Sequence, residues 1–299
     1  MLPRFALLFM PLIHLSLGYP GCGWTDLITK ARADQTAIET AAAGMNRQAS
    51  ASQSPKQASA DSQQAEARHS DKDTDKDPAK KDSGPPSLPD LDKILDKYVA
   101  AIGGKTAIRA QNSLVMKGTI RVEALGADGT IEVYSKAPNK ELVELKSPML
   151  GSSRTGFNGT SAWEQDDDGT KELTAYPKRD ADFYLPVKLH ELYPKIEVKR
   201  KEKVGSGEAF MLEAPRAGNP KRWYFDVETG LLIRTEACDT LENIVRSESY
   251  YDYRSVDGVK RPFTVIRTEE GGVEVTVKFS DIRHNVAIDD SKFEKPATK

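Results

Sequence analysis

The stretch VEVTVKFSDIR at residues 273–283 alternates apolar and polar side chains. The side chains of one parity are apolar: Val273, Val275, Val277 and Phe279. Because successive side chains of a β-strand point to opposite faces, this pattern predicts a strand with one apolar and one polar face. Antiparallel sheets that cover a core on one side are built from such strands.

The same two-residue period runs through most of the chain after residue 113. The first run places four apolar residues on one face: Leu114, Met116, Ile120 and Val122. Ala127-Asp128-Gly129 predicts a hairpin turn, beyond which Ile131 and Val133 continue the alternation. Two further turns are predicted at Asn158-Gly159 and Asp168-Gly169, and later runs at 208–214, 221–226, 231–237, 243–253 and 261–269. We predict an α+β, β-dominated domain in which about 10–11 antiparallel strands form a strongly curved sheet, an unclosed β-barrel.

Helices are predicted at three places. Ser87 or Asp90 caps the first, with Pro89 in its first turn, and Gly103-Gly104 ends it. Its apolar stripe consists of Leu91, Ile94, Leu95, Tyr98 and Ile102. A short second helix is predicted around 106–110 and a third around 180–193. We expect the helices to cover the concave face of the sheet and to leave an apolar concavity there.

The N-terminal residues 1–21 have the features of a secretory signal peptide. Arg4 is followed by an apolar core, 5–18, that is shorter than the roughly 20 residues of a membrane-spanning helix. Ser16-Leu17-Gly18 offers small residues to ordinary signal peptidase. Tyr19-Pro20-Gly21-Cys22 is similar to a bacterial lipobox, in which Cys22 would become the lipid attachment site. We expect an exported periplasmic protein, anchored at the outer membrane as a lipoprotein if Cys22 is lipidated.

Residues 22–88 separate this segment from the domain. Between about 46 and 88 Ala, Ser, Gln, Asp and Lys dominate and large apolar residues are missing, so the segment cannot offset its chain entropy by burial. We therefore predict a disordered tether, with a possible short helix at 25–44, and a folded domain at 89–299.

Composition and motifs argue against several functions. The net charge is −2, and the basic run at 199–203 alternates with Glu197 and Glu202, so we expect no nucleic-acid partner. The domain holds two histidines, His190 and His284, and neither a nucleophile elbow nor a phosphate loop, which predicts a non-enzymatic protein without cofactor or metal. Residues 164–169 resemble a calcium loop only in part, because Ala175 stands where the bidentate Glu belongs. They are interpreted as an acidic hairpin tip.

A succession of short segments resembles a known family. The segments are 94–104 (ILDKYVAAIGG), 115–119 (VMKGT), 136–140 (KAPNK), 156–163 (GFNGTSAW), 224–232 (YFDVETGLL), 251–263 (YDYRSVDGVKRPF) and 285–296 (NVAIDDSKFEKP). Their order and spacing are similar to those of outer-membrane lipoprotein-sorting-like proteins of acidobacteria and related bacteria, distant relatives of LolA/LolB and RseB-type carriers and sensors. The resemblance covers about 90–297.

The resemblance implies an unclosed β-barrel with helices over its mouth and an apolar cavity for acyl chains. The candidates to line such a cavity are Leu114, Met116, Ile120, Val122, Val133, Trp163, Phe183, Tyr184, Leu185, Trp223, Phe225, Val275, Val277 and Phe279. The stretch 182–187 is either a mobile lid or ordinary helix packing, and the tryptophans either contact a ligand or fill the core. One hypothesis is a carrier that binds a lipid or a lipoprotein acyl chain. The other is an interaction or sensor module whose half-barrel binds another envelope protein.

Overall fold

The computed structural model describes residues 88–174, 176, 178–215, 220–239, 241 and 243–297. These residues belong to the β-rich domain. The predicted signal peptide, Cys22, the helix at 25–44 and all but the last residue of the tether lie outside the described residues.

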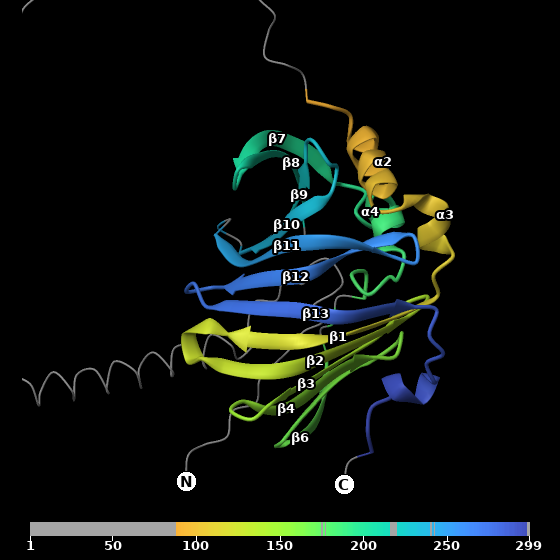
Figure 1. Ribbon diagram of the computed structural model, residues 1–299, viewed down its shortest axis with the longest axis vertical. Helices are drawn as coiled ribbons and strands as arrows, with labels where there is room; N and C mark the ends of the chain where they lie inside the picture. Colours follow the sequence, from red (N-terminus) through yellow and green to blue (C-terminus); the bar gives the residue numbers. More distant parts are fainter. Residues whose placement is uncertain are drawn as a thin grey trace, which may run out of the picture. The chain divides into compact units, whose positions relative to one another are not determined.

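One antiparallel sheet dominates the described part of the chain, and it holds thirteen strands (Figure 1). They are β1 Ser113–Val122, β2 Ala127–Lys136, β3 Lys140–Ser147, β4 Gly151–Phe157, β5 Ala162–Asp166, β6 Gly169–Leu173, β7 Glu197–Val204, β8 Gly207–Ala214, β9 Lys221–Asp226, β10 Leu232–Cys238, β11 Ile244–Val256, β12 Val259–Glu269 and β13 Glu274–His284. Two meanders, β1 to β6 and β7 to β13, meet where β1 pairs with β13. The edge strands β6 and β7 do not pair, so the predicted unclosed barrel is confirmed.

Sequence periodicity underestimated the number of strands and misplaced one turn. The strands β3 and β5 bury residues in succession, so their alternation is weak in the sequence. The turn predicted at 127–129 lies earlier, in a 3-10 helix at Glu123–Leu125 followed by Gly126 with φ +57°. Asp128 and Gly129 are instead residues of β2, where the Asp128 carboxylate accepts from the Arg121 guanidinium of β1 at 2.9 Å. The turns at Asn158-Gly159 and Asp168-Gly169 are found as predicted.

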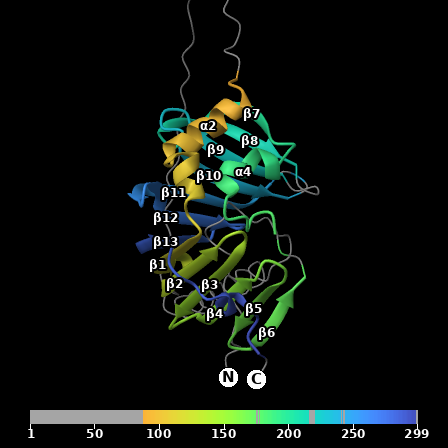
Figure 2. The same cartoon turned by 90° about the vertical axis from the view of Figure 1, so that its right-hand side faces the viewer.

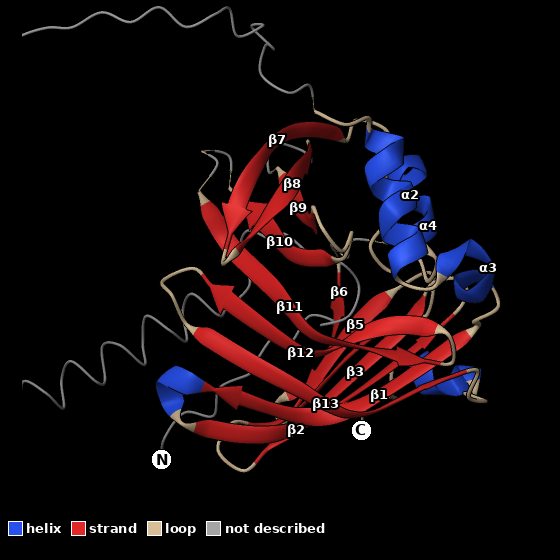
Figure 3. Cartoon of the chain, turned by 45° about the horizontal axis from the view of Figure 1, so that its top comes forward, coloured by secondary structure: helices blue, strands red, loops and turns tan. Residues whose placement is uncertain are grey.

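Helices α2 (Leu91–Ala101), α3 (Gly104–Arg109) and α4 (Leu185–Leu192) lie together beside the sheet (Figures 2 and 3). The Asp90 side chain caps α2 by accepting from the Asp92 amide at 2.9 Å, so Pro89 precedes the cap rather than entering the first turn. The third helix is shorter than predicted, because the chain forms turns until the helix begins at Leu185, with Pro186 in its first turn. A further 3-10 helix spans Asp290–Phe293.

The two faces of the sheet have separate cores. The inner face, defined as the face that packs against α2 and α4, carries the alternating apolar residues of β1, β2, β12 and β13, joined by Leu95, Tyr98 and Leu189. The outer face carries a smaller cluster: Val115, Leu142, Trp163, Ile288 and Phe293. The inner core therefore fixes α2 and α4 against the sheet. No helix in the described part of the chain has the length and apolar character to span a bilayer.

Candidate functional site

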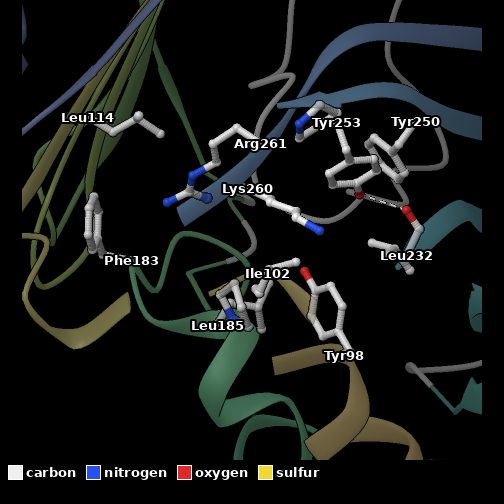
Figure 4. Close-up of a pocket in the computed structure, with 12 residues that line it drawn as sticks. Tyr98, Ile102, Leu114, Phe183, Leu185, Leu232, Tyr250, Tyr253, Lys260 and Arg261 are labelled. Atoms are coloured by element: carbon white, nitrogen blue, oxygen red, sulfur yellow. Dashed lines mark hydrogen bonds between the residues drawn. The ribbon is translucent and has the colours of Figure 1, made fainter. Parts of the chain in front are cut away.

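A pocket opens on the inner face where α2 and the start of α4 meet β11 and β12 (Figure 4). Its volume is about 60 Å³. The lining residues come from six elements and the segment before α4: Tyr98, Ile102, Leu114, Phe183, Leu185, Pro186, Leu232, Tyr250, Tyr253, Lys260, Arg261 and Pro262. Since one water molecule needs roughly 10–15 Å³ on this measure, the pocket has room for a handful of waters.

Aromatic and aliphatic side chains form most of the pocket wall. The Tyr98 ring contacts Phe225 with a centroid separation of 5.0 Å. The Tyr253 hydroxyl donates to the Leu232 carbonyl at 2.7 Å, and the Tyr250 hydroxyl donates to the Glu248 carboxylate at 2.9 Å. Burial raises the pKa of Tyr98 to about 12, so this phenol is neutral at physiological pH.

Two cationic side chains reach this pocket from adjacent positions of β12. Figure 4 shows Arg261 and Lys260 both projecting toward the space that the apolar residues surround. The Arg261 Nε donates to His284 Nε2 at 3.3 Å, and the Lys260 backbone amide donates to the Ile102 carbonyl at 2.8 Å. Burial lowers the pKa of Arg261, yet a guanidinium stays protonated in proteins, so the pocket carries a permanent positive charge.

The imidazole of His284 supports Arg261 from the end of β13. Its side chain is fully buried, and its Nδ1 faces the Asp257 carboxylate at 3.5 Å, beyond ordinary hydrogen-bond distance. Burial and the nearby Arg261 charge lower the pKa of His284 to about 4, while Asp257 acts in the opposite direction. The ring is therefore neutral at pH 7, with Nε2 as the acceptor for Arg261.

Acidification should destabilise the protein through this histidine. Between pH 6.5 and 4 the unfolded chain binds a proton that the folded imidazole does not, so stability falls with pH until the folded ring is also protonated. From pH 7.5 to 5 the loss from this group is about 2 kcal/mol. Urea denaturation at both pH values measures it, with His284→Gln as the comparison. The variant should lose about 2 kcal/mol less than the wild type; an identical pH dependence would contradict the assignment.

Buried ion pairs occupy the inner face farther along β11 and β12. The Arg267 guanidinium lies 2.6 Å from Glu248 Oε1, and both side chains are almost fully buried. Arg246 and Glu269 form the neighbouring pair at 3.1 Å. The Tyr250 hydroxyl links this network to the pocket, because it donates to Glu248 and lies 3.1 Å from the Thr235 hydroxyl.

The residues predicted to line a cavity fall into three groups. Leu114, Phe183 and Leu185 line the pocket. The largest group belongs to the inner core without lining the pocket: Met116, Ile120, Val122, Val133, Tyr184, Trp223, Phe225, Val275, Val277 and Phe279. Trp163 lies instead in the outer-face cluster, where its indole N–H donates to the Phe293 carbonyl at 2.9 Å. Trp163 is therefore not a residue of the inner face.

Sequence reasoning missed both cations and the tyrosines of the pocket. A signal for Arg261 was present, because it shares the parity of Val259, Phe263 and Val265 on β12. A cation in phase with an apolar strand face is unusual and marks a charge that the fold brings inside. The tyrosines carry no such signal, because aromatic residues are ordinary on strand faces.

The other side chains considered for metal binding or catalysis lie away from this pocket. In the described residues no group of three or more His, Cys, Asp or Glu side chains is placed to hold a metal ion. The acidic hairpin tip is closed by Asp166, whose Oδ1 accepts from the Asp168 and Gly169 amides at 2.9 and 3.0 Å. His190 pairs with Asp92 at 2.9 Å on an exposed surface between α4 and α2.

The fold, an unclosed antiparallel half-barrel with helices on its inner face, places the domain in a defined structural class. A LolA-superfamily protein from Nitrosomonas europaea superposes with a TM-score of 0.50 at 15% identity, covering 70% of this chain and 99% of the other. A domain named for outer-membrane lipoprotein sorting, from Vibrio parahaemolyticus, gives 0.48 at 13% identity, covering 67% and 94%. A DUF1329 family protein from Desulfovibrio piger gives 0.49 at 12% identity, covering 68% and 97%. The chain has the LolA-like fold. At the level of sequence, no family model matches the chain, and no curated protein matches it significantly.

Proposed function

We propose that this protein is a non-enzymatic module of the bacterial envelope that binds the acyl chain of a lipid or lipoprotein against its inner face. The observation that supports this most is the pocket between α2, α4 and β12, whose walls are largely apolar and aromatic. Apolar walls with a few polar groups are typical of small-molecule sites. Export and lipidation of Cys22 remain part of the proposal, as does the outer-membrane location.

An acyl chain is larger than the pocket as it stands, so binding requires α4 or α2 to move away from the sheet. Helix α4 spans Leu185–Leu192, and no side chain caps its N-terminus. Helices this short have little stability of their own and depend on packing. Displacing Phe183 and Leu185 would join the pocket to the apolar inner core. Burying a methylene contributes about 0.8 kcal/mol, which is enough to offset the lost packing over several carbons.

Protein purified gently from membranes should carry a bound lipid. Native mass spectrometry of the full-length protein is expected to show a lipid adduct. Phe183→Asp, which places a carboxylate in the pocket wall, should lose most of the adduct, whereas Met149→Asp, at an exposed apolar position, should keep it. A clean unliganded mass for the wild type would count against lipid binding.

A second candidate is an interaction or sensor module. The observation that favours it is the filling of the inner face by the protein's own buried side chains. In that case crosslinking in cells would capture another envelope protein, and the purified chain would carry no lipid.

A further inference from the structure

The pocket differs from the rest of the inner face in how its charge is compensated. Two buried arginines of this face, Arg267 and Arg246, each lie within 3.1 Å of a carboxylate oxygen. Arg261 does not share this arrangement. In the described residues its ionisable neighbours are His284, Tyr98 and Tyr253, all neutral at pH 7, and no carboxylate contacts it.

Arg261 is half-buried in the pocket wall, and no carboxylate in the described residues offsets its charge. A partly buried charge without a partner loses part of its hydration, and an anion in the pocket would compensate for that loss. Here the imidazole satisfies only the Nε–H of Arg261. The two terminal NH₂ groups form the planar fork that binds a carboxylate or phosphate through paired hydrogen bonds.

Lys260 adds a second positive charge to the pocket. Its side chain follows the other strand parity and is exposed, but it also lines the pocket, and in the described residues its ammonium forms no ion pair. Two cations beside Leu114, Phe183 and Leu185 combine an anion-binding group with an apolar wall. A molecule with an anionic head and an apolar tail satisfies both at once.

We propose that the pocket binds an anionic single-chain amphiphile, with its carboxylate or phosphate head on Arg261 and Lys260 and its tail against Phe183 and Leu185. The proposal rests on the proposed lipid-binding function and adds the class of head group. A neutral lipid would leave the guanidinium fork without an anion, so selectivity for charge is the property that distinguishes this site.

Isothermal titration calorimetry of the purified full-length protein tests this selectivity for an anionic head group. Four probes are compared: laurate, dodecyl phosphate, dodecanol and inorganic phosphate. The first three share one chain length. We expect laurate or dodecyl phosphate to bind at least tenfold more tightly than dodecanol, and inorganic phosphate to bind far more weakly than either. The stronger of the two anions identifies the head group. If inorganic phosphate alone bound tightly, the ligand would not need an apolar tail, and the proposal of an amphiphile would be overturned.

Substitutions test whether Arg261 is responsible for the preference for anionic probes. Arg261→Met should weaken the preferred anion at least tenfold and leave dodecanol unchanged. Arg283→Met is the matched control, because Arg283 is exposed on the neighbouring strand and pairs with Asp281; it should bind like the wild type. If Arg261→Met does not fold, Arg261→Lys and Lys260→Met give the same test, with an expected loss of several-fold for the anions only.

The outcomes separate the two proposals. If the anions and dodecanol bind equally well and Arg261→Met changes nothing, lipid binding stands and the anion site is overturned. If no chain-bearing probe binds the wild type, the proposed function itself fails and the anion site fails with it.

Discussion

Glu248→Leu is expected to destabilise the protein by about 3–5 kcal/mol, because it leaves the Arg267 guanidinium without its closest carboxylate inside the protein. Glu248 is 2% exposed and Arg267 is 4% exposed. The carboxylate accepts from Arg267 Nη2 at 2.6 Å and from the Tyr250 hydroxyl at 2.9 Å. Glu269 lies 3.8 Å from Arg267, but it also pairs with Arg246 at 3.1 Å, so it would offset the lost interaction only in part.

The double variant Glu248→Leu/Arg267→Met gives the control. It removes both charges, so most of the loss seen in the single variant should be recovered. Arg254→Met removes an exposed partner of Asp252 and should change stability by less than about 1 kcal/mol. Urea denaturation with linear extrapolation measures all three variants. A loss below about 1 kcal/mol for Glu248→Leu would show that the buried pair is not important for stability.

Features that depend on neighbouring residues could be predicted from the sequence. Helix α2 follows from the Asp90 cap, its apolar stripe and Gly103, all within one short segment. The strand β13 follows from its strict alternation, and Val275 and Val277 are buried on one face as that alternation requires. The half-barrel follows from the number of such strands and from the family resemblance.

Features that depend on which face a short strand presents could not be predicted. Trp163 lies in β5, where Ala162, Trp163 and Glu164 are all buried, so no parity assigns the indole to one side. The pocket is a second example, because α2, β1, the start of α4, β10, β11 and β12 all contribute to it. Apolar residues alone were chosen as cavity candidates, and that choice excluded Arg261. The positive charge that Arg261 brings to the pocket therefore could not be found by a search for apolar surface.

Gly103→Ala is expected to destabilise the protein by about 3 kcal/mol or more, because a methyl group there has no space and the backbone conformation is unfavourable. Gly103 follows α2 with φ +125°, and a Cβ would lie 2.1 Å from the Gly258 carbonyl oxygen and 3.2 Å from the Val259 Cα. Both neighbours are backbone atoms of the β11–β12 turn and cannot rotate away. The adjacent hydrogen bond from the Lys260 amide to the Ile102 carbonyl holds α2 at the pocket, and this contact would be strained.

Gly104→Ala separates the steric effect from the conformational one. Gly104 also has a positive φ, +87°, but no atom lies within 4 Å of its Cβ position. Its substitution should therefore cost only the backbone strain, about 1–2 kcal/mol. Thermal and urea denaturation of the two variants measure the difference. Equal losses would mean that the close contact between α2 and the β11–β12 turn does not contribute, whereas a larger loss for Gly103→Ala would identify that contact as the attachment that positions Tyr98 and Ile102 in the pocket wall.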